Sequence, residues 1–417
     1  MNVKKKDFAA AIIFGLLTAY LSYRIVEAEL SNMVSDYTGH VYVYLPLLLK
    51  KETFTQGLGA APYFLWHFIT IAGYKLFGIP LEYAAGYTNG LFGIFTYITV
   101  YFFVYSLYKK TGRDVGAITI PLISFGMCIL QPISAKWMNA WILDAAPITP
   151  NPLSNPTYLA TRGFAVLAFC LVLDIWGKQE SDDYKGIFFK VENGLTRYYI
   201  ALSVVLLLSV LAKPTFVEMF IPAVGIMMLF KWAGEGAKKD GSGRKYFGIL
   251  FKTFLTAVPA ILIVFAQFLM YFIFGGSYGE GGSVVVTPFL RVWRMFTDNV
   301  GLSIILALLF VMFVMLIRTV TFIDSNAGRL ALTCFGVGFL QAAFLGESTK
   351  LGHGDFMWPL MSAMFLLFLA AVAALVLHKD NEDRPVKDAL TFTAWTIFAL
   401  HVFCGVLLII EELSVKL

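Results

Sequence analysis

Charged residues are scarce in this sequence. Only 14% of the 417 residues are Asp, Glu, Lys or Arg, against roughly 25% in an ordinary soluble domain, while 59% are hydrophobic and the mean hydropathy is +0.74. One core cannot bury so much apolar surface, and uncharged runs such as Gly301 to Ile317 and Phe356 to Leu377 are typical of membrane spans. The composition excludes a soluble globular protein, a disordered chain and a collagen.

Cysteine is also rare, and its placement excludes a disulfide scaffold. The four cysteines, Cys128, Cys170, Cys334 and Cys404, all lie in apolar runs, and no two form a C-x-x-C pair. They are expected to be small buried hydrophobes rather than redox or zinc ligands. The net charge is +5. In a membrane protein, basic residues mark the loops that face the cytoplasm, so this charge is not evidence for a nucleic-acid partner. The glycine-rich segment Gly275 to Gly282 lacks a phosphate-loop pattern, which argues against a nucleotide site.

Segments of about 20 apolar residues recur along the whole chain. They predict an all-α polytopic membrane protein in which residues 1–417 form a single transmembrane domain. The stretch from Tyr198 to Trp232 is broken by Lys213-Pro214 and again by Pro222, which favours two short spans joined by a tight outer turn. A single kinked helix and a re-entrant pair are the alternatives. About eleven spans are expected, at residues 8–26, 84–107, 115–133, 157–177, 198–212, 214–231, 247–274, 299–317, 330–346, 356–377 and 389–410.

The positions of lysine and arginine predict the orientation. With a cytoplasmic N-terminus, the inner segments hold about two thirds of these residues, as the positive-inside rule requires. The C-terminus is then outside. The first outer loop, residues 27–83, is unusually long. Two apolar segments inside it, His40 to Leu49 and Ala61 to Phe77, carry aromatic and basic residues at a density that favours helices lying along the interface.

Most of the conspicuous polar motifs then lie on the outer face. Asp36 follows the first span, where partial desolvation would suit it to general-base work, although a solvated loop position or a helix cap is common for such an Asp. Lys213 interrupts an apolar stretch. One interpretation is a functional cation. The other is a structural lysine, which pairs with Glu218 or extends its ammonium group outward to the interface.

A second outer cluster is the sequence ESTKLGHGD, with Glu347, Lys350, His353 and Asp355. Its carboxylates, together with Asp144 from another loop, are candidate ligands for a divalent metal such as Mg or Mn, and Lys350 is a candidate phosphate ligand; a solvated loop is the alternative. Arg291 and Arg294 would share a helix face and either clamp a phosphate or anchor the helix in the headgroup layer. His67 and His401 lie on apolar segments and are expected to pack internally.

Several of these segments resemble the GT-C superfamily of integral-membrane glycosyltransferases. Asp36 in SDYTGHVYVYLP stands where that superfamily has an acidic residue soon after the first span, and APYFLWHFITIAGYKLFG is similar to its second interfacial helix. Asn155-Pro156-Thr157, Lys213-Pro214-Thr215 and the segment HGDFMWPLMSAMFLLF from His353 also resemble features of bacterial members. Many members have two acids in the first loop, whereas His40 is the nearest second ionisable group here, which puts metal dependence in doubt.

The resemblance implies hexosyl or pentosyl transfer from a polyprenyl-phosphate-linked sugar to a hydroxyl of a glycan or lipid acceptor, on the outer face and with inversion. Asp36 would be the general base. Lys213, Arg291 or Lys350 would stabilise the leaving phosphate, and His40 and His353 are further candidates for substrate binding. A bacterial inner membrane is the expected location, with membrane lipids as surroundings.

Two other classes of function and a purely structural role remain open. A lipid-linked saccharide transporter or flippase predicts ionisable residues near the bilayer midplane and matching broken helices, and Lys213 with Glu218 is the one such pair in the sequence. An O-antigen-type polymerase or ligase has a similar composition, but its largest outer loop is expected late in the chain. In this chain the largest loop comes first.

Overall fold

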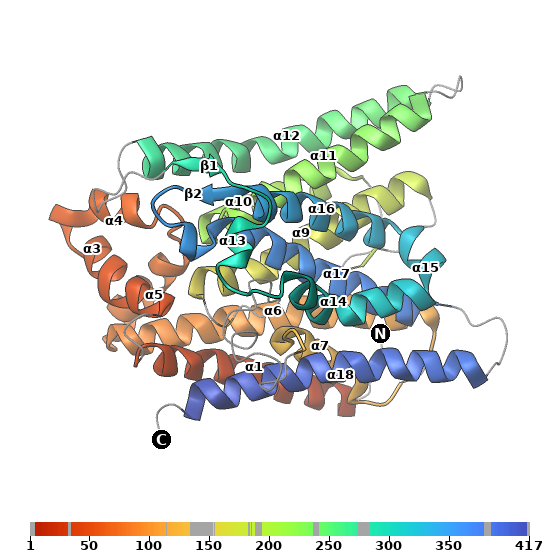
Figure 1. The fold of residues 1–417 in the computed structure, drawn as a ribbon, viewed down its shortest axis with the longest axis horizontal. Helices are drawn as coiled ribbons and strands as arrows, with labels where there is room; N and C mark the ends of the chain where they lie inside the picture. The colour runs from red at the N-terminus through yellow and green to blue at the C-terminus, as the bar shows by residue number, and fades with distance from the viewer. Residues whose placement is uncertain are drawn as a thin grey trace.

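The protein is a bundle of long apolar helices (Figure 1). The structure is a computed structural model that describes residues 5–31, 35–113, 115–133, 153, 155–181, 184, 186–187, 194–236, 242–273, 283–378 and 385–414. Within these residues, nine helices are long and apolar enough to cross a membrane. They are α1 (Lys5–Glu29), α6 (Leu81–Thr111), α9 (Pro156–Glu180), α11 (Thr215–Gly236), α12 (Ser242–Phe268), α14 (Val300–Ile317), α16 (Asn326–Phe344), α17 (Trp358–Leu377) and α18 (Pro385–Ser414).

Two further apolar helices are shorter: α7 (Thr119–Ile129) and α10 (Thr196–Ala212). Each of the eleven ranges expected to span therefore contains a helix, but only nine have the length of a full crossing. The stretch from Tyr198 to Trp232 forms two helices, α10 and α11, which separate at Lys213 and Pro214. Pro222 does not break the chain again, because α11 continues through it.

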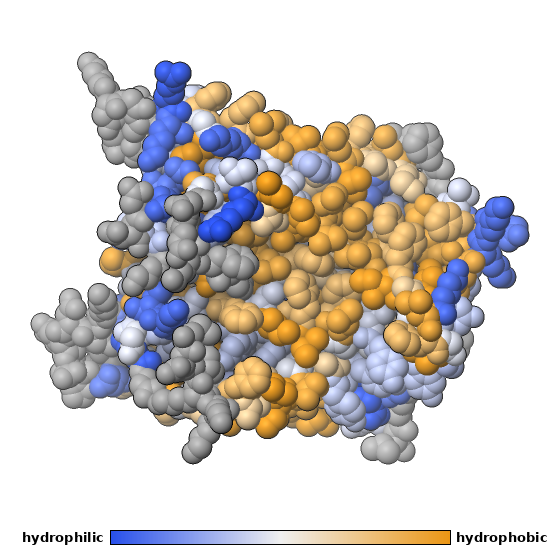
Figure 2. Space-filling view, turned by 180° about the vertical axis from the view of Figure 1, so that it is seen from behind, coloured by the Kyte–Doolittle hydropathy of each residue, from blue (hydrophilic) through white to orange (hydrophobic). Residues whose placement is uncertain are grey.

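The outer surface of the bundle is apolar around its middle. Figure 2 shows a broad hydrophobic area with polar residues concentrated toward the two ends of the long axis. Large apolar side chains such as Leu16, Phe230, Leu316 and Phe392 are exposed on this surface. Exposed apolar surface of this extent is stable in lipid but not in water, so the protein is an integral membrane protein.

Helices α9 and α17 form the centre of the bundle. In the most apolar 18-residue segment of each helix, 94% of the residues are buried inside the protein. The corresponding share for α12 is 22%. Alanine and small residues in α17, including Ala363, Ala370 and Ala374, allow neighbouring helices to approach closely. These two helices therefore provide a rigid support for the loops at their ends.

The long first loop folds into short helices at one end of the bundle, at the left in Figure 1. Helix α5 packs against α6, and buried Asn89 of α6 ties the loop to the bundle: its Oδ1 accepts from Nε1 of Trp66 (3.0 Å) and its Nδ2 donates to the Tyr37 hydroxyl (2.6 Å). The elements of this loop are α2 (Asp36–Thr38), a π-helical turn (Gly39–Tyr44), α3 (Leu45–Leu49), a 3₁₀ turn (Lys51–Thr53), α4 (Phe54–Ala60) and α5 (Leu65–Phe77).

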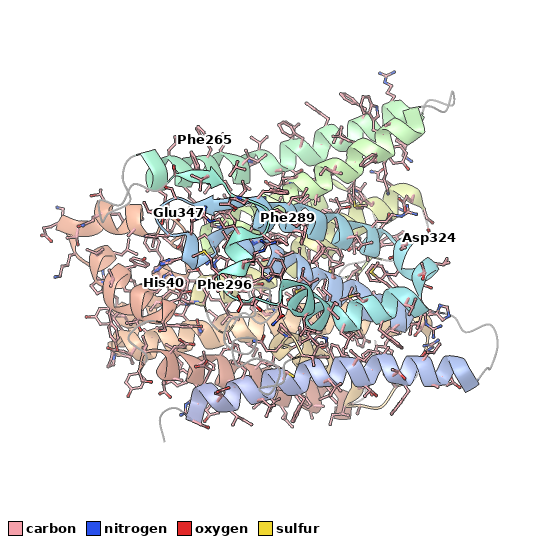
Figure 3. All side chains as sticks on the ribbon, in the orientation of Figure 1. His40, Phe265, Phe289, Phe296, Asp324 and Glu347 are labelled. Atoms are coloured by element: carbon pink, nitrogen blue, oxygen red, sulfur yellow. The ribbon has the colours of Figure 1, made fainter. Side chains whose placement is uncertain are left out.

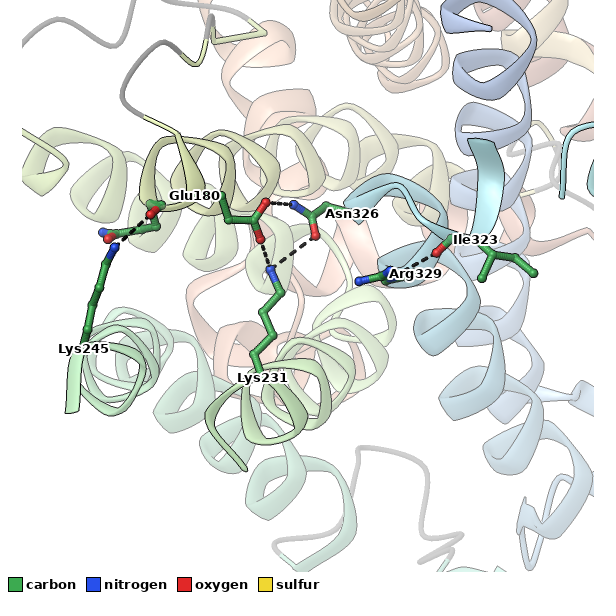
Figure 4. A network of polar contacts seen from close by, with 7 residues as sticks. Glu180, Lys231, Lys245, Ile323, Asn326 and Arg329 are labelled. Carbon is green, nitrogen blue, oxygen red and sulfur yellow. Dashed lines mark hydrogen bonds and ion pairs between the residues drawn. The ribbon is translucent and has the colours of Figure 1, made fainter. Parts of the chain in front are cut away.

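The polar residues at the opposite end bring together loops that were expected to lie inside the cell. Lys231 pairs with Glu180, whose other oxygen accepts from Nδ2 of Asn326 (2.8 Å), and Nζ of Lys245 donates to the carbonyl of Gln179 (3.0 Å; Figure 4). The ends of α9 and α11 and the starts of α12 and α16 thus share one face. Figure 3 shows Asp324 at this end, whereas His40 and Glu347 lie at the other.

A small β-ribbon departs from the purely helical expectation. Strands β1 (Val284–Val286) and β2 (Leu345–Glu347) pair antiparallel, with Val284 opposite Glu347. The ribbon ties the segment before α14 to the end of α16 and so fixes the place of Glu347. The remaining short elements are a π-helical turn (Leu269–Ile273), α13 (Arg291–Arg294), α15 (Thr319–Ile323) and two 3₁₀ turns (Leu351–His353 and Asp355–Met357).

Candidate active site at the first-loop end of the bundle

A pocket of about 180 Å³ lies between the first loop and the ends of α10, α11, α12 and α17. Charged and aromatic side chains line it together, an unusual combination in a protein with so few charges. Its lining comes from five separate segments of the chain: Pro62, Tyr63, Lys213, Pro214, Thr215, Glu218, Val264, Gln267, Phe268, Tyr271, Glu347, Asp355, Phe356 and Trp358.

Lys213 is at the centre of this site because the helix breaks there. Its extended backbone ends α10, and Pro214 follows, so the lysine side chain is not on a helix face. Only 6% of Lys213 is exposed, and its Nζ lies 4.2 Å from the Trp358 ring centre and 5.8 Å from that of Tyr63. Burial lowers the pKa of Lys213, while Asp36, Asp355 and Glu218 are close enough to raise it electrostatically.

Glu347 and Asp355 meet on another wall of the pocket. Glu347 ends β2 and is 4% exposed; the Tyr271 hydroxyl donates to its Oε1 (3.4 Å). Burial, a hydrogen bond with Asp355 and that residue's charge together raise the pKa of Glu347 to about 7. The close approach of the two carboxyl groups therefore favours the protonated form of Glu347.

Asp36 lies beside the pocket rather than in its lining. Ser35, not Asp36, caps α2, since the Ser35 hydroxyl accepts from the amide of Thr38 (3.2 Å). The Asp36 side chain is exposed, so the desolvation expected from the sequence is absent. Its Oδ2 accepts from Nδ2 of Asn155 (2.9 Å), and Asn155 in turn caps α9. One carboxylate oxygen is thus held in place from the N-terminus of a central helix.

His40 is buried behind the pocket. Its Nδ1 lies 2.9 Å from Nε2 of His67, and the rings of Tyr44, Tyr63 and Trp66 surround it. Burial lowers the pKa of His40 to about 3, and the charge of Lys213 acts in the same direction. The neutral pair joins the π-helical turn to α5. His67 and His401 are both buried and hydrogen-bonded, as expected.

The other candidates from the sequence are not in the pocket lining. Arg291, Arg294 and His353 are exposed, and Lys350 is half-buried. Asp144 lies outside the described residues. No group of three His, Cys, Asp or Glu side chains in the described part of the chain could hold a metal ion. Glu347 and Asp355 supply two carboxylate groups, too few protein ligands to form a metal site by themselves.

Several pocket residues were not singled out from the sequence as site residues: Tyr63, Gln267, Tyr271 and Trp358. Gln267 carried a signal, because a polar side chain in the apolar run of residues 247–274 is costly unless it has a partner or a function. The aromatic residues carried none, because this chain has 39 Phe, 20 Tyr and 8 Trp. Comparisons with protein-family models, with curated proteins and with solved structures find no match to this chain.

Proposed function

We propose that the protein is a membrane glycosyltransferase that moves a sugar from a polyprenyl-phosphate donor to a hydroxyl of a glycan or lipid acceptor on the outer face of a cell membrane. One observation carries the proposal: buried Lys213 lines a pocket at the end of the bundle, close enough to interact electrostatically with Asp355 in the pocket lining and with Asp36 beside the pocket. A base and a cation close to one another are the two groups that displacement of a phosphate requires.

The chemistry is a single displacement. Asp36 takes the proton of the acceptor hydroxyl, and the acceptor oxygen bonds to the anomeric carbon of the sugar. The bond from that carbon to the phosphate oxygen breaks, its electron pair stays on the phosphate, and the Lys213 ammonium offsets the new negative charge. Attack opposite the leaving group inverts the anomeric carbon. Asn155 holds one oxygen of Asp36, which keeps the carboxylate oriented.

A lipid-linked donor is supported by a second pocket on the same helices. It is almost entirely apolar, and it includes Ile221, Val224 and Ala257, further along α11 and α12 from Glu218 and Val264 of the site. A ligand whose head reaches Lys213 can leave its hydrocarbon chain along these helices, within the bilayer. A soluble nucleotide sugar would have no use for such a surface.

A transporter of lipid-linked saccharides is the second candidate. The observation in its favour is that central helix α9 carries two ionisable residues that are buried in the bundle, Arg162 and Asp174. Ionisable groups inside a membrane are often part of a transport pathway. A transporter would move a lipid-linked saccharide across proteoliposomes without breaking its phosphate bond, which separates the two functions.

The test is turnover by purified protein in proteoliposomes. A panel of polyprenyl-phosphate hexoses and pentoses, radiolabelled in the sugar, is offered with membrane glycan and lipid extracts as acceptors. We expect Asp36→Asn to lower the rate about 10²- to 10⁴-fold, the usual contribution of a general base. Asp298→Asn, at an exposed aspartate outside the site, should leave the rate unchanged. Equal rates for Asp36→Asn and the unmodified protein would show that Asp36 is not the base.

A further inference from the structure

Two buried polar atoms on residues that line the pocket have no hydrogen-bond partner within the described part of the chain. They are Oε1 of Gln267 and Oγ1 of Thr215, on residues that are 5% and 8% exposed. Both residues line the pocket. A buried polar atom without a partner costs about 1–3 kcal/mol, and native proteins keep few of them. Two such atoms at one pocket indicate that a ligand or ordered water supplies the missing bonds.

The orientation of Gln267 is fixed by the protein. Its Nε2 donates to the carbonyl of Pro62 (3.1 Å) and to that of Val210 (3.2 Å). Both hydrogens of the amide are therefore in use, and turning the amide over would put Oε1 against two carbonyl oxygens. Oε1 can only accept a hydrogen bond, so its ligand must present an O–H or N–H group.

Thr215 offers a hydroxyl at the start of α11, one residue beyond Pro214. A hydroxyl both donates and accepts, so it pairs well with another hydroxyl. Three aromatic residues, Tyr63, Trp358 and Phe356, also line the pocket. Hydroxyl partners beside aromatic faces suit a sugar ring, which has O–H groups around its edge and C–H groups on its faces.

The size of the pocket limits the ligand. At about 180 Å³ it is smaller than the roughly 300–1,000 Å³ of pockets for drug-sized molecules. A volume of this size holds one monosaccharide. Lys213 lines the same pocket and so provides a cation close to a sugar phosphate bound there.

We infer that Gln267 and Thr215 are specificity-determining residues, which bind hydroxyl groups of the single sugar residue carried by the donor. The inference rests on the proposed function for the identity of the donor. Recognition by hydrogen bonds to buried atoms discriminates strongly, because a sugar that lacks the hydroxyl leaves the protein atom unpaired. The pocket would thus select the sugar, while Asp36 and Lys213 carry out its transfer.

Thr215→Val is the test variant, because the hydroxyl it removes has no partner among the residues that the structure describes. The Tm of ligand-free protein should stay the same or rise. Binding is measured by calorimetry in nanodiscs on the Asp36→Asn background, which prevents turnover. The probes are polyprenyl phosphate without a sugar, polyprenyl-phosphate hexoses and pentoses, and their monodeoxy forms.

We expect Thr215→Val to weaken binding of the preferred sugar-bearing probe about 5- to 10-fold, the value of one hydrogen bond, and to leave the sugar-free probe unaffected. Thr215→Ser, which keeps the hydroxyl, should bind like the parent. For one monodeoxy probe, Thr215→Val should cause no further loss, because the partner hydroxyl is already missing.

The outcomes separate the two proposals. If Thr215→Val weakens all probes equally, or none of them, the inference is wrong and the pocket atoms bind only water, while the proposed function still stands on the Asp36→Asn rates. If no polyprenyl-phosphate probe binds to any variant, both the donor class and the sugar site are wrong.

Discussion

The buried carboxyl group of Glu347, beside Asp355, makes this residue sensitive to pH. An isolated Glu has a pKa of 4.5, and in the folded protein burial and Asp355 raise that of Glu347 to about 7. Between these values the folded state binds more protons than the unfolded state, so stability falls as pH rises from about 4.5 to 7. We expect Glu347→Gln to remove this fall and to be the more stable protein at pH 8, by on the order of 1 kcal/mol.

The measurement for this pair is the apparent Tm of purified protein at pH 5 and pH 8. Asp298→Asn, at an exposed carboxylate, is the matched control and should follow the unmodified protein at both values. A Glu347→Gln variant that loses stability to the same extent at both pH values would mean that Glu347 is ionised throughout and contributes as a charge.

At the scale of elements, close contacts between helices depend on particular glycines. A Cβ on Gly405 of α18 would lie 1.7 Å from the carbonyl oxygen of Ile129 at the end of α7, whereas a Cβ on Gly336 of α16 would meet nothing within 4 Å. Because the obstacle is backbone, α18 would have to move away from α7. We expect Gly405→Ala to cost more than about 2 kcal/mol.

The control is built into the same protein. Gly336→Ala should be neutral or stabilising by about 0.5–1 kcal/mol, the advantage of alanine in a helix. Apparent Tm values of the two variants in one detergent give the comparison. Similar Tm values for both would show that α7 and α18 are further apart than the structure has them.

For the whole molecule, the residues at the two ends of the helix bundle are predicted to face opposite sides of the membrane. Asp324 and Glu347 lie at opposite ends of the bundle (Figure 3), and all four native cysteines are buried, so background labelling should be low. We expect a membrane-impermeant maleimide to label Thr349→Cys in intact cells and Asp324→Cys only after permeabilisation; both positions are exposed. Labelling of both in intact cells, or the reverse order, would contradict the topology with the active site outside.

The sequence was sufficient to predict most of the helices. A run of apolar residues long enough to cross lipid has few alternatives to a helix, because every backbone polar group must be satisfied within the segment. Two predictions were less accurate, for different reasons. The segment at residues 115–133 forms a helix, α7, that is shorter than the predicted span, since apolar composition alone does not set where a helix ends. The sequence also predicts a second break at Pro222, but α11 continues through this residue, because proline is tolerated inside membrane helices.

By itself, the sequence determined that this is a membrane protein, where its helices run and that the chain breaks at Lys213-Pro214, because hydropathy and proline geometry act locally. Only the tertiary structure decided which polar residues meet. It brought Lys213, Glu347 and Asp355 to one pocket, placed Asp36 beside it on Asn155 and buried His40 against His67. It also turned Gln267 and Thr215, from different helices, toward the same space. These contacts depend on how helices that are far apart in the sequence pack against one another, and local sequence patterns do not predict such packing.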